Sequence, residues 1–495
     1  MTCQQAALAV IATSCGGVSA QDQIKCISST NPLVDSLSYF PPSMRITGDG
    51  FPAGAADVTI ASGFSVHYDN YFKVVKTICG PHQPAGCKDK TYVLTLCGAD
   101  KPTKYANGTA LSPDVIHFTV PLTAVATTKS GPVPFLELLG LLNKVEVVDP
   151  NYIHSPCLQN LEQNGNITGS KQSDTANFKK LIADHPRVTG VFTDSWGTGK
   201  SNTSKDIIFD GSADSAGVLG RAEWIKFMSL FFNDEDKANL YFSREQTAYK
   251  STEEKVKAAK STTAKTCAWV EKSWSGKYQV KFPKYQIDLC KSAGLTPYVN
   301  DTLLNAKTYK QEFATTADFH EFLHKQDVVI DLTYYWDPTT ANKAAVLEKL
   351  GNIAGLNKAG AMLLRTDAHM SDTKSKLHGS STGSALDWLE SAIARPALVL
   401  QDLASMVWGN DKIAAPPAGC AQYFRNVLKD EMPDVNTHES CEKFAAAEKE
   451  GKCITNAIKP TEVDRSYLSS GAMSASSTAI VSTILATIFA VLTIF

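Results

Sequence analysis

Residues 219–251 read LGRAEWIKFMSLFFNDEDKANLYFSREQTAYKS, and this stretch separates two similar halves of the chain. Large apolar residues recur in it at i, i+3, i+4, i+7 and i+8, the spacing of one helical face. They are Trp224, Phe227, Met228, Phe231 and Phe232. Asn233 is then a candidate N-cap, and the acids that follow it suit the first turn of a second helix. A second apolar face resumes with Ala238, Tyr241, Phe242 and Tyr249.

We predict two consecutive helices, or one kinked helix, over residues 213–260, connecting two α/β lobes. The alternative is an ordinary pair of amphipathic helices inside one large domain. The flanks favour the first prediction, because each carries an apolar strand that ends in tryptophan. These strands are VTGVFTDSW at 188–196 and DVVIDLTYYW at 327–336.

The first half contains runs rich in β-branched and aromatic residues, which predict strands. They lie at 64–75, 91–98 and 115–122. The last run leads through a polar loop to an apolar helical stretch at 135–142 and to KVEVV at 144–148. Strand, loop, helix and strand in this order are typical of the βαβ unit of a parallel sheet.

The second half alternates in the same way after a linker rich in lysine and threonine. Predicted strands lie at 266–274, 277–282, 327–336 and 361–367. Predicted helices lie at 285–294, 316–325, 341–353 and 385–408. Pro396 should split the last of these, because proline cannot occupy a helix interior without breaking it. The C-terminal region contains cysteines and a predicted helix at 421–431.

The two ends of the chain indicate export. Residues 1–20 have a short apolar run and end in Val18-Ser19-Ala20, which fits signal-peptide cleavage. Residues 478–495 are apolar and uncharged, and small residues and a short polar spacer precede them. This is the pattern of a GPI-attachment signal, with Ser470 as the expected attachment site. The alternative is a C-terminal transmembrane anchor.

Cysteine usage agrees with export. Ten of the twelve cysteines follow the signal peptide, and an even number in a secreted chain predicts disulfides, whose pairing the sequence leaves open. The sequence contains no CxxC pair, which argues against zinc-ribbon or thioredoxin chemistry. Glycosylation sequons begin at Asn107, Asn166, Asn202 and Asn300. The formal net charge of −2 gives no indication of nucleic-acid binding.

The predicted organisation is an α/β fold of two Rossmann-like lobes linked by a long helix, with extra N-terminal strands. Its segments are a signal peptide (1–20), an N-terminal extension (21–57), an N-lobe (58–212), the helical connection (213–260), a C-lobe (261–410), a Cys-containing juxtamembrane region (411–470) and a hydrophobic GPI-signal tail (471–495).

Three short motifs suggest enzyme chemistry. HEFLH at 320–324 matches the HExxH motif of zinc proteases, but a third ligand pattern does not follow it. GSSTG at 379–383 matches GxSxG, but a polar loop precedes it where a nucleophile elbow needs a strand. WGTGKS at 196–201 resembles part of a P-loop, but Asp194 replaces its first glycine. We therefore predict a protein that is not an enzyme and keep a secreted zinc metalloprotease as an alternative.

Candidate binding residues follow from the predicted sheets. In open α/β sheets ligands bind at the carboxyl ends of strands, and pockets favour domain interfaces. These rules select Asp194, Ser195, Trp196, Trp274, Tyr334, Tyr335 and Trp336.

The chain resembles the substrate-binding proteins of cobalamin and ferric-siderophore uptake, the periplasmic-binding-protein class with two lobes joined by a long helix (class III). The matching segments are HFTVPLTAVATTKSGPVPFLELLG, KVEVVDPNYIHSPC, VTGVFTDSW and LGRAEWIKFMSLFFNDEDKA. The resemblance implies ligand-facing loops that add further candidates. These are Thr127, Thr128, Lys129, Ser130, Tyr152 and His154.

The resemblance implies a ligand rather than a cofactor or a catalytic site. Cobalamin has flat apolar faces and amide edges, which suit tryptophan and tyrosine. An anionic ferric siderophore, or haem, would instead require cations, for which Lys129, Lys200 and Arg365 are candidates. We expect cobalamin or another large metal-organic ligand. Further expected partners are the membrane at the C-terminus and a membrane transporter or endocytic receptor.

Overall fold

The computed structural model describes most of the chain between residues 26 and 453. The described ranges are 26–29, 32–33, 39–40, 54–150, 153–169, 175–196, 204–260, 264–335, 337–371, 385–418, 420, 422–436, 440–449 and 453. The predicted signal peptide, C-terminal tail and GSSTG motif lie outside them. So do Tyr152, Lys200, Asn202, Trp336 and Ser470.

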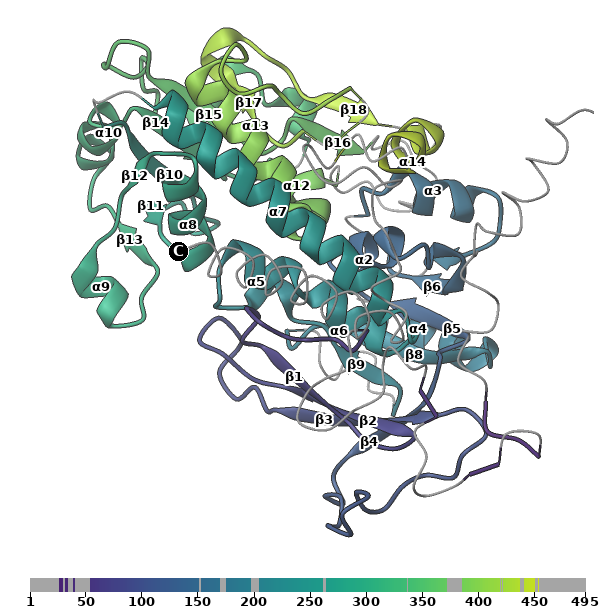
Figure 1. The fold of residues 1–495 in the computed structure, drawn as a ribbon. Helices are drawn as coiled ribbons and strands as arrows, with labels where there is room; N and C mark the ends of the chain where they lie inside the picture. Colours follow the sequence, from purple (N-terminus) through teal and green to yellow (C-terminus); the bar gives the residue numbers. More distant parts are fainter. Residues whose placement is uncertain are drawn as a thin grey trace, which may run out of the picture.

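Two α/β lobes lie on either side of the long helix α7, Glu235–Ala259 (Figure 1). The N-lobe contains a parallel sheet of order β7-β6-β5-β8-β9. Its strands are β5 Ala124–Thr127, β6 Val145–Val148, β7 Thr168–Gly169, β8 Val188–Thr193 and β9 Asp206–Ile208. Its helices are α2 Val133–Leu138, α3 Pro156–Gln163 and α4 Thr175–Asp184. The predicted two-lobed α/β fold is confirmed.

The C-lobe sheet is mixed, with the order β13-β11-β10-β14-β15-β17 and β12 beside β10. Its strands are β10 Thr266–Lys272, β11 Tyr278–Lys281, β12 Thr296–Pro297, β13 Lys310–Glu312, β14 Val328–Asp331, β15 Met362–Arg365 and β17 Arg425–Asn426. The helix expected at 421–431 is wrong, because β17 and a short 3-10 turn occupy it. Asn426 hydrogen-bonds to the backbone N–H of Leu428 at that turn, a local bond that competes with a helix.

The C-lobe helices cover both faces of this sheet. They are α8 Lys284–Ser292, α9 Asp301–Asn305, α10 Thr316–His324, α11 Lys343–Lys349, α12 Asp387–Glu390 and α13 Pro396–Trp408. As predicted, Pro396 divides the last apolar run, since it is the first residue of α13. A small sheet pairs β16 His369–Ser371 with β18 Asp434–Asn436, and α14 Cys441–Lys449 follows.

A four-stranded sheet occupies the first part of the predicted N-lobe range and corrects two strand predictions. The run at 64–75 is a hairpin of β1 Phe64–Tyr68 and β2 Phe72–Thr77, because Asp69-Asn70 makes a turn inside it. The run at 115–122 supplies β4 Ile116–Val120, which pairs with β3 Lys90–Leu96. The βαβ unit of the N-lobe therefore begins one strand later, at β5.

The helical connection consists of α5 Val218–Ala222, α6 Trp224–Leu230 and α7. Asn233 is in the left-handed region, with φ of 57°, and Asp234 rather than Asn233 is the N-cap of α7. The chain therefore changes direction between α6 and α7, which excludes one smoothly kinked helix. Asparagine tolerates this backbone conformation better than most residues do.

Helix α7 belongs to both hydrophobic cores. Ala238 and Phe242, near its beginning, pack in the N-lobe core together with the aromatic face of α6. Ala248, Tyr249 and Val256, farther along, pack in the C-lobe core. At about 1.5 Å per residue, one stiff element spans the junction of the lobes.

Buried carboxylates attach the N-terminal sheet to this connection. Glu223 accepts hydrogen bonds from the backbone of Thr59, Ile60 and Ala61, and Asp214 accepts from Gly63 and from the Trp224 indole. The ammonium of Lys73, fully buried, lies 2.6 Å from Glu235.

The ten cysteines pair as five disulfides. The pairs are Cys26–Cys97, Cys79–Cys87, Cys157–Cys441, Cys267–Cys290 and Cys420–Cys453. The prediction of disulfides is confirmed. Among the described sequon residues, Asn107 and Asn166 are exposed, and Asn300 is the N-cap of α9.

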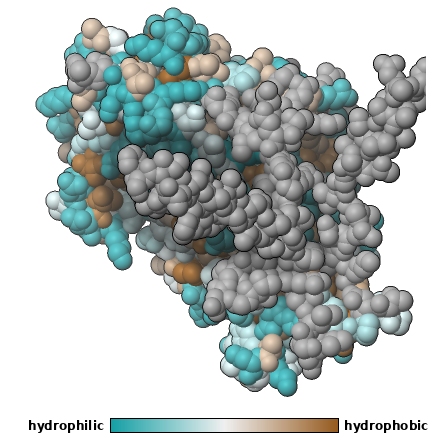
Figure 2. Space-filling view, in the orientation of Figure 1, coloured by the Kyte–Doolittle hydropathy of each residue, from teal (hydrophilic) through white to brown (hydrophobic). Residues whose placement is uncertain are grey.

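Figure 2 shows a described surface that is largely hydrophilic, with separate apolar patches over the C-lobe. Within the ranges given above, no helix is both long and apolar enough to cross a membrane.

Replacing Lys73 with Met should destabilise the chain by about 3–5 kcal/mol, because Glu235 would be left as a buried, unpaired charge. Chemical denaturation of the purified chain measures this loss. The double variant Lys73→Met/Glu235→Gln should recover part of it. If Lys73→Met alone left the unfolding midpoint unchanged, the pair would not hold the sheet to α7.

Candidate functional site

The carboxyl ends of the two sheets face each other across α12. The segment after β6 brings His154 to Asp387 of α12, with 3.2 Å between Nδ1 and Oδ1. The segment after β15 forms β16, and Met370 of β16 bridges to Leu386 at the beginning of α12. The strand ends of both lobes therefore meet at one junction, where ligands bind in open α/β sheets.

A hollow of about 320 Å³ lies at this junction, and we call it the strand-end hollow. Its N-lobe wall includes Lys129, Ser130 and Asp194, three of the predicted binding residues, which follow β5 and β8. Lys129 and Asp194 form an ion pair at 3.7 Å, and both side chains are partly exposed. This part of the wall is therefore polar but close to neutral in charge.

The opposite wall comes from helices, and sequence reasoning did not identify it. It includes Tyr285 of α8, together with Trp388 and Leu389 of α12. Trp388 stacks on Trp269 of β10, and Leu389 is 54% exposed. Strand-end rules cannot select these residues, because they lie within helices whose exposed faces depend on how the lobes pack.

Arg221 of α5 is the cation that the sequence missed. Its guanidinium lies 4.1 Å from the centre of the Tyr285 ring and lines the strand-end hollow. Its buried Nε has no hydrogen-bond partner within the described part of the chain. Burial lowers the pKa of Arg221, although Tyr285 and Asp214 act in the opposite direction. The arginine therefore brings a positive charge to the wall of the strand-end hollow.

Exposed indoles follow central strands in both lobes. Trp196, after β8, is 62% exposed, and Trp274, after β10, is 76% exposed. Trp274 also contacts the Tyr334 ring, with 5.3 Å between ring centres. Large exposed aromatic side chains are typical of ligand-binding surfaces, although neither indole lines the strand-end hollow.

Several residues that the sequence predicts as ligand contacts are buried in the fold rather than exposed in the cleft. Thr127 and Thr128 are buried and bond to backbone around β5 and β8. The guanidinium of Arg365 is buried between Asp331 and Asp367 and stacks on Tyr335, which is itself buried. Arg365 and Tyr335 are therefore corrections to the predicted ligand contacts, because the C-lobe core already uses their polar groups.

Ser195 lies on a different surface of the N-lobe. Its backbone N–H donates to Asp210, and it lines a hollow of about 330 Å³ beside the Cys79–Cys87 loop. His82 of that loop contacts the ring of Tyr309, with 4.4 Å between ring centres, so the loop reaches the C-lobe.

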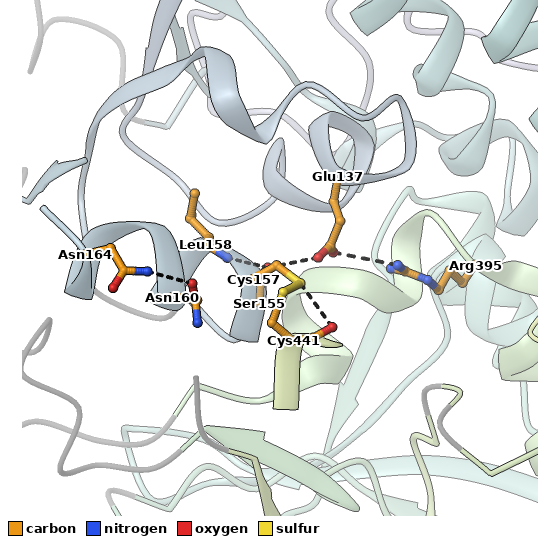
Figure 3. The surroundings of a disulfide bond; sticks show 8 residues. All are labelled: Glu137, Ser155, Cys157, Leu158, Asn160, Asn164, Arg395 and Cys441. Atoms are coloured by element: carbon orange, nitrogen blue, oxygen red, sulfur yellow. Dashed lines mark hydrogen bonds and ion pairs between the residues drawn. A yellow bond between two sulfur atoms is a disulfide. The ribbon is translucent and has the colours of Figure 1, made fainter. Parts of the chain in front are cut away.

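A larger hollow of about 700 Å³ lies on the other side of α12, and we call it the helix-side hollow. Parts of α2, α3, α7, α12 and α14 line it. Glu390 of α12 accepts hydrogen bonds from the backbone N–H groups of His154 and Ser155, at 2.8 and 2.7 Å. Figure 3 shows Glu137 between Ser155 and Arg395 beside the same hollow. We call the contacts of His154 and Ser155 with Asp387 and Glu390 the interlobe lock.

The interlobe lock is buried, and burial shifts its protonation. Burial raises the pKa of Glu390 to about 8, although His154 acts to lower it. Burial would lower the pKa of His154, but Asp387, Glu390 and Glu137 raise it above its ordinary value. Burial would raise the pKa of Asp387, but His154 lowers it to about 2.

The HExxH motif lies on α10, away from both hollows. His320 Nε2 donates to the carbonyl of Leu350 at 2.8 Å, and Glu321 forms an exposed ion pair with Lys325. In the ranges given above, no group of three or more His, Cys, Asp or Glu residues could hold a metal ion. The motif is therefore a structural part of the C-lobe in the described chain.

Comparison with known proteins finds similarity of structure only. No family model matches the chain, and no curated protein matches it. A periplasmic binding protein from Veillonella parvula aligns at 13% identity and TM-score 0.41, over 58% of this chain and 91% of its own. The periplasmic haem-binding protein HutB of Vibrio cholerae aligns at 12% identity and TM-score 0.37, over 55% and 96%.

A third solved structure is the siderophore-binding protein BauB, bound to two acinetobactin molecules and ferric iron. It aligns at 13% identity and TM-score 0.38, over 58% of this chain and 92% of its own. All these TM-scores are below 0.5. The chain's own two sheets and shared helix therefore define the class of its fold.

Between pH 5 and 8 the contribution of the interlobe lock to stability should fall as the pH rises. Because the pKa of His154 is raised in the folded chain, its contribution to stability is complete below about 6.5, the pKa in the unfolded chain. This contribution is lost as the pH rises through the pKa in the folded chain. The raised pKa of Glu390 acts in the same direction, from its ordinary 4.5 up to about 8. Melting temperatures measured across this range test the slope.

Glu390→Gln should flatten this pH profile, because it removes one of the two groups. Glu254→Gln, on an exposed part of α7, is the matched control and should keep the wild-type slope. Equal slopes of melting temperature against pH for wild type and Glu390→Gln would contradict the assignment of this pH dependence to Glu390.

Proposed function

We propose that this chain is a binding protein without catalytic activity, which captures cobalamin (vitamin B12) for uptake in the cleft between its lobes. The observation that carries the proposal is the pair of exposed indoles, Trp196 and Trp274, that follow the central strands β8 and β10 of the two sheets. Flat aromatic rings suit the apolar faces of a corrin, and the polar wall of Lys129, Ser130 and Asp194 suits its amide edges.

The charges near the cleft support a ligand with little net charge. Lys129 is paired with Asp194, and Arg365 is buried between two aspartates. Arg221 remains as one cation for a single anionic group, such as the phosphate of cobalamin. A polyanionic ligand would require several converging cations, which the described walls of the strand-end hollow do not supply.

A ferric siderophore or haem is the second candidate. Arg221 is the observation in its favour, because its charge and its stacked ring partner suit a carboxylate on a flat ligand. Among the aligned structures, HutB is described as haem-binding and BauB as siderophore-binding. These descriptions define the ligand panel for the test.

The proposed location is the cell surface. Its support is the sequence of residues 1–20 and 471–495, with GPI attachment at Ser470 or a C-terminal transmembrane anchor. The five disulfides agree with an oxidising compartment. The algal cobalamin acquisition protein is the particular protein that this combination resembles. A membrane transporter or endocytic receptor would receive the cargo.

Cyanocobalamin at 100 times its Kd should raise the apparent stability of the purified full-length chain by about 2.7 kcal/mol. A thermal-shift panel of cyanocobalamin, haem and ferric siderophores measures this. No shift with cyanocobalamin at micromolar concentration, combined with a clear shift for haem or a siderophore, would replace the vitamin with that ligand.

Trp274→Ala should weaken cyanocobalamin binding roughly tenfold, because a stacked indole contributes about 1–2 kcal/mol of buried aromatic contact. Met432→Ala, at another exposed apolar residue, is the matched control and should leave the Kd unchanged. Titration calorimetry gives both constants. Unchanged affinity in Trp274→Ala would remove the indole from the site.

A further inference from the structure

Helix α14 connects the two lobes covalently. Its first residue, Cys441, is bonded to Cys157 of α3 in the N-lobe (Figure 3). Beyond its last turn, Cys453 is bonded to Cys420, and both sulfurs lie in the C-lobe core together with Ala447. None of the other disulfides links the N-lobe to an element of the C-lobe core.

The N-lobe end of α14 is beside the interlobe lock. Cys157 is two residues after Ser155, whose N–H donates to Glu390. Cys157, Cys441 and Ala445 line the helix-side hollow, as do His154 and Glu390. A disulfide that fixes α14 to α3 therefore closes one side of this hollow and limits how far α3 can move from α12.

The two disulfides that hold α14 differ in exposure. Cys420 and Cys453 are 3% and 1% exposed, whereas Cys157 and Cys441 are both partly exposed. A thiol reagent in solution therefore reaches the N-lobe attachment first, because exchange requires access to a sulfur atom.

We propose that α14 is a redox-sensitive strap, which holds the lobes together while Cys157–Cys441 is intact and opens the helix-side hollow when that bond is reduced. A dithiol supplies the two electrons. One of its thiolates attacks the disulfide to give a mixed disulfide, and its second thiol then displaces the protein sulfur. Cys157 and Cys441 end as thiols with two protons, and the reagent ends as a cyclic disulfide.

The strap acts on lobe separation and does not depend on the identity of the ligand. With the strap released, α7, the lock, the Arg221–Tyr285 stack and the His82–Tyr309 contact still join the lobes, but no disulfide links them. The lock should then open more often.

Hydrogen exchange of the full-length chain without ligand tests the strap, because the amides of His154 and Ser155 exchange only when their bonds to Glu390 open. In Cys157→Ser/Cys441→Ser these amides should exchange roughly tenfold faster than in wild type. The β10 amides should be unchanged, which shows that the C-lobe core is folded. Cys26→Ser/Cys97→Ser, which removes a disulfide beside the four-stranded sheet, is the matched control and should leave both sets at wild-type rates.

A mild dithiol added to folded wild type should reproduce the faster exchange, and it should have no further effect on Cys157→Ser/Cys441→Ser. The measurement on wild type needs no variant to fold. Unchanged exchange at His154 and Ser155 after confirmed reduction of Cys157–Cys441 would overturn the proposal. Since no ligand is present, this result is independent of whether the chain binds cobalamin.

Discussion

The spacing of the two lobes depends on α7. Its first turns are buried in the N-lobe core and its later turns in the C-lobe core, so neither lobe can move away without exposing apolar surface of the same helix. At about 25 cal/mol per Å² of apolar surface, even a modest separation would be costly. The cleft at the strand ends is therefore largely preformed, and preformed sites lose less free energy to ordering when a ligand binds.

Buried polar groups fix the orientation of the segments that this hydrophobic packing holds together. Glu223 and Asp214 hold the N-terminal sheet against α5 and α6, while Glu390 holds the segment after β6 against α12. In each case a carboxylate accepts several backbone N–H groups from a segment far away in sequence. Such bonds fix orientation, because a buried carboxylate that lost its donors would be destabilised strongly. Together, α7 and these carboxylates place the two sets of strand ends opposite each other.

Much of the fold could be predicted from the sequence, because the signals were local. The apolar spacing of Trp224 to Phe232, the proline that begins α13 and the apolar strands each follow from nearby residues. The secondary-structure predictions were wrong where contacts with residues distant in sequence override the local sequence pattern. A turn at Asp69-Asn70 divides one β-rich run, and pairing with β15 makes a strand at Arg425–Asn426 where a helix was expected.

The candidate site was only half predictable for the same reason. Lys129, Ser130, Asp194, Trp196 and Trp274 follow strands, and their placement follows from topology. Arg221, Tyr285 and Trp388 come from helices, and only the packing of the lobes brings them to the hollow. The role of Arg365 could not be predicted from the sequence. Only the folded core shows that its guanidinium binds two aspartates rather than a ligand.

The most direct measurement is the position of the metal in crystals grown with cyanocobalamin. Anomalous scattering collected at the cobalt edge locates the metal without a model of the ligand. One cobalt peak is expected between the lobes, beside the wall formed by Lys129, Asp194 and Trp388. A peak on the outer surface of either lobe, or no peak at saturating ligand, would contradict it.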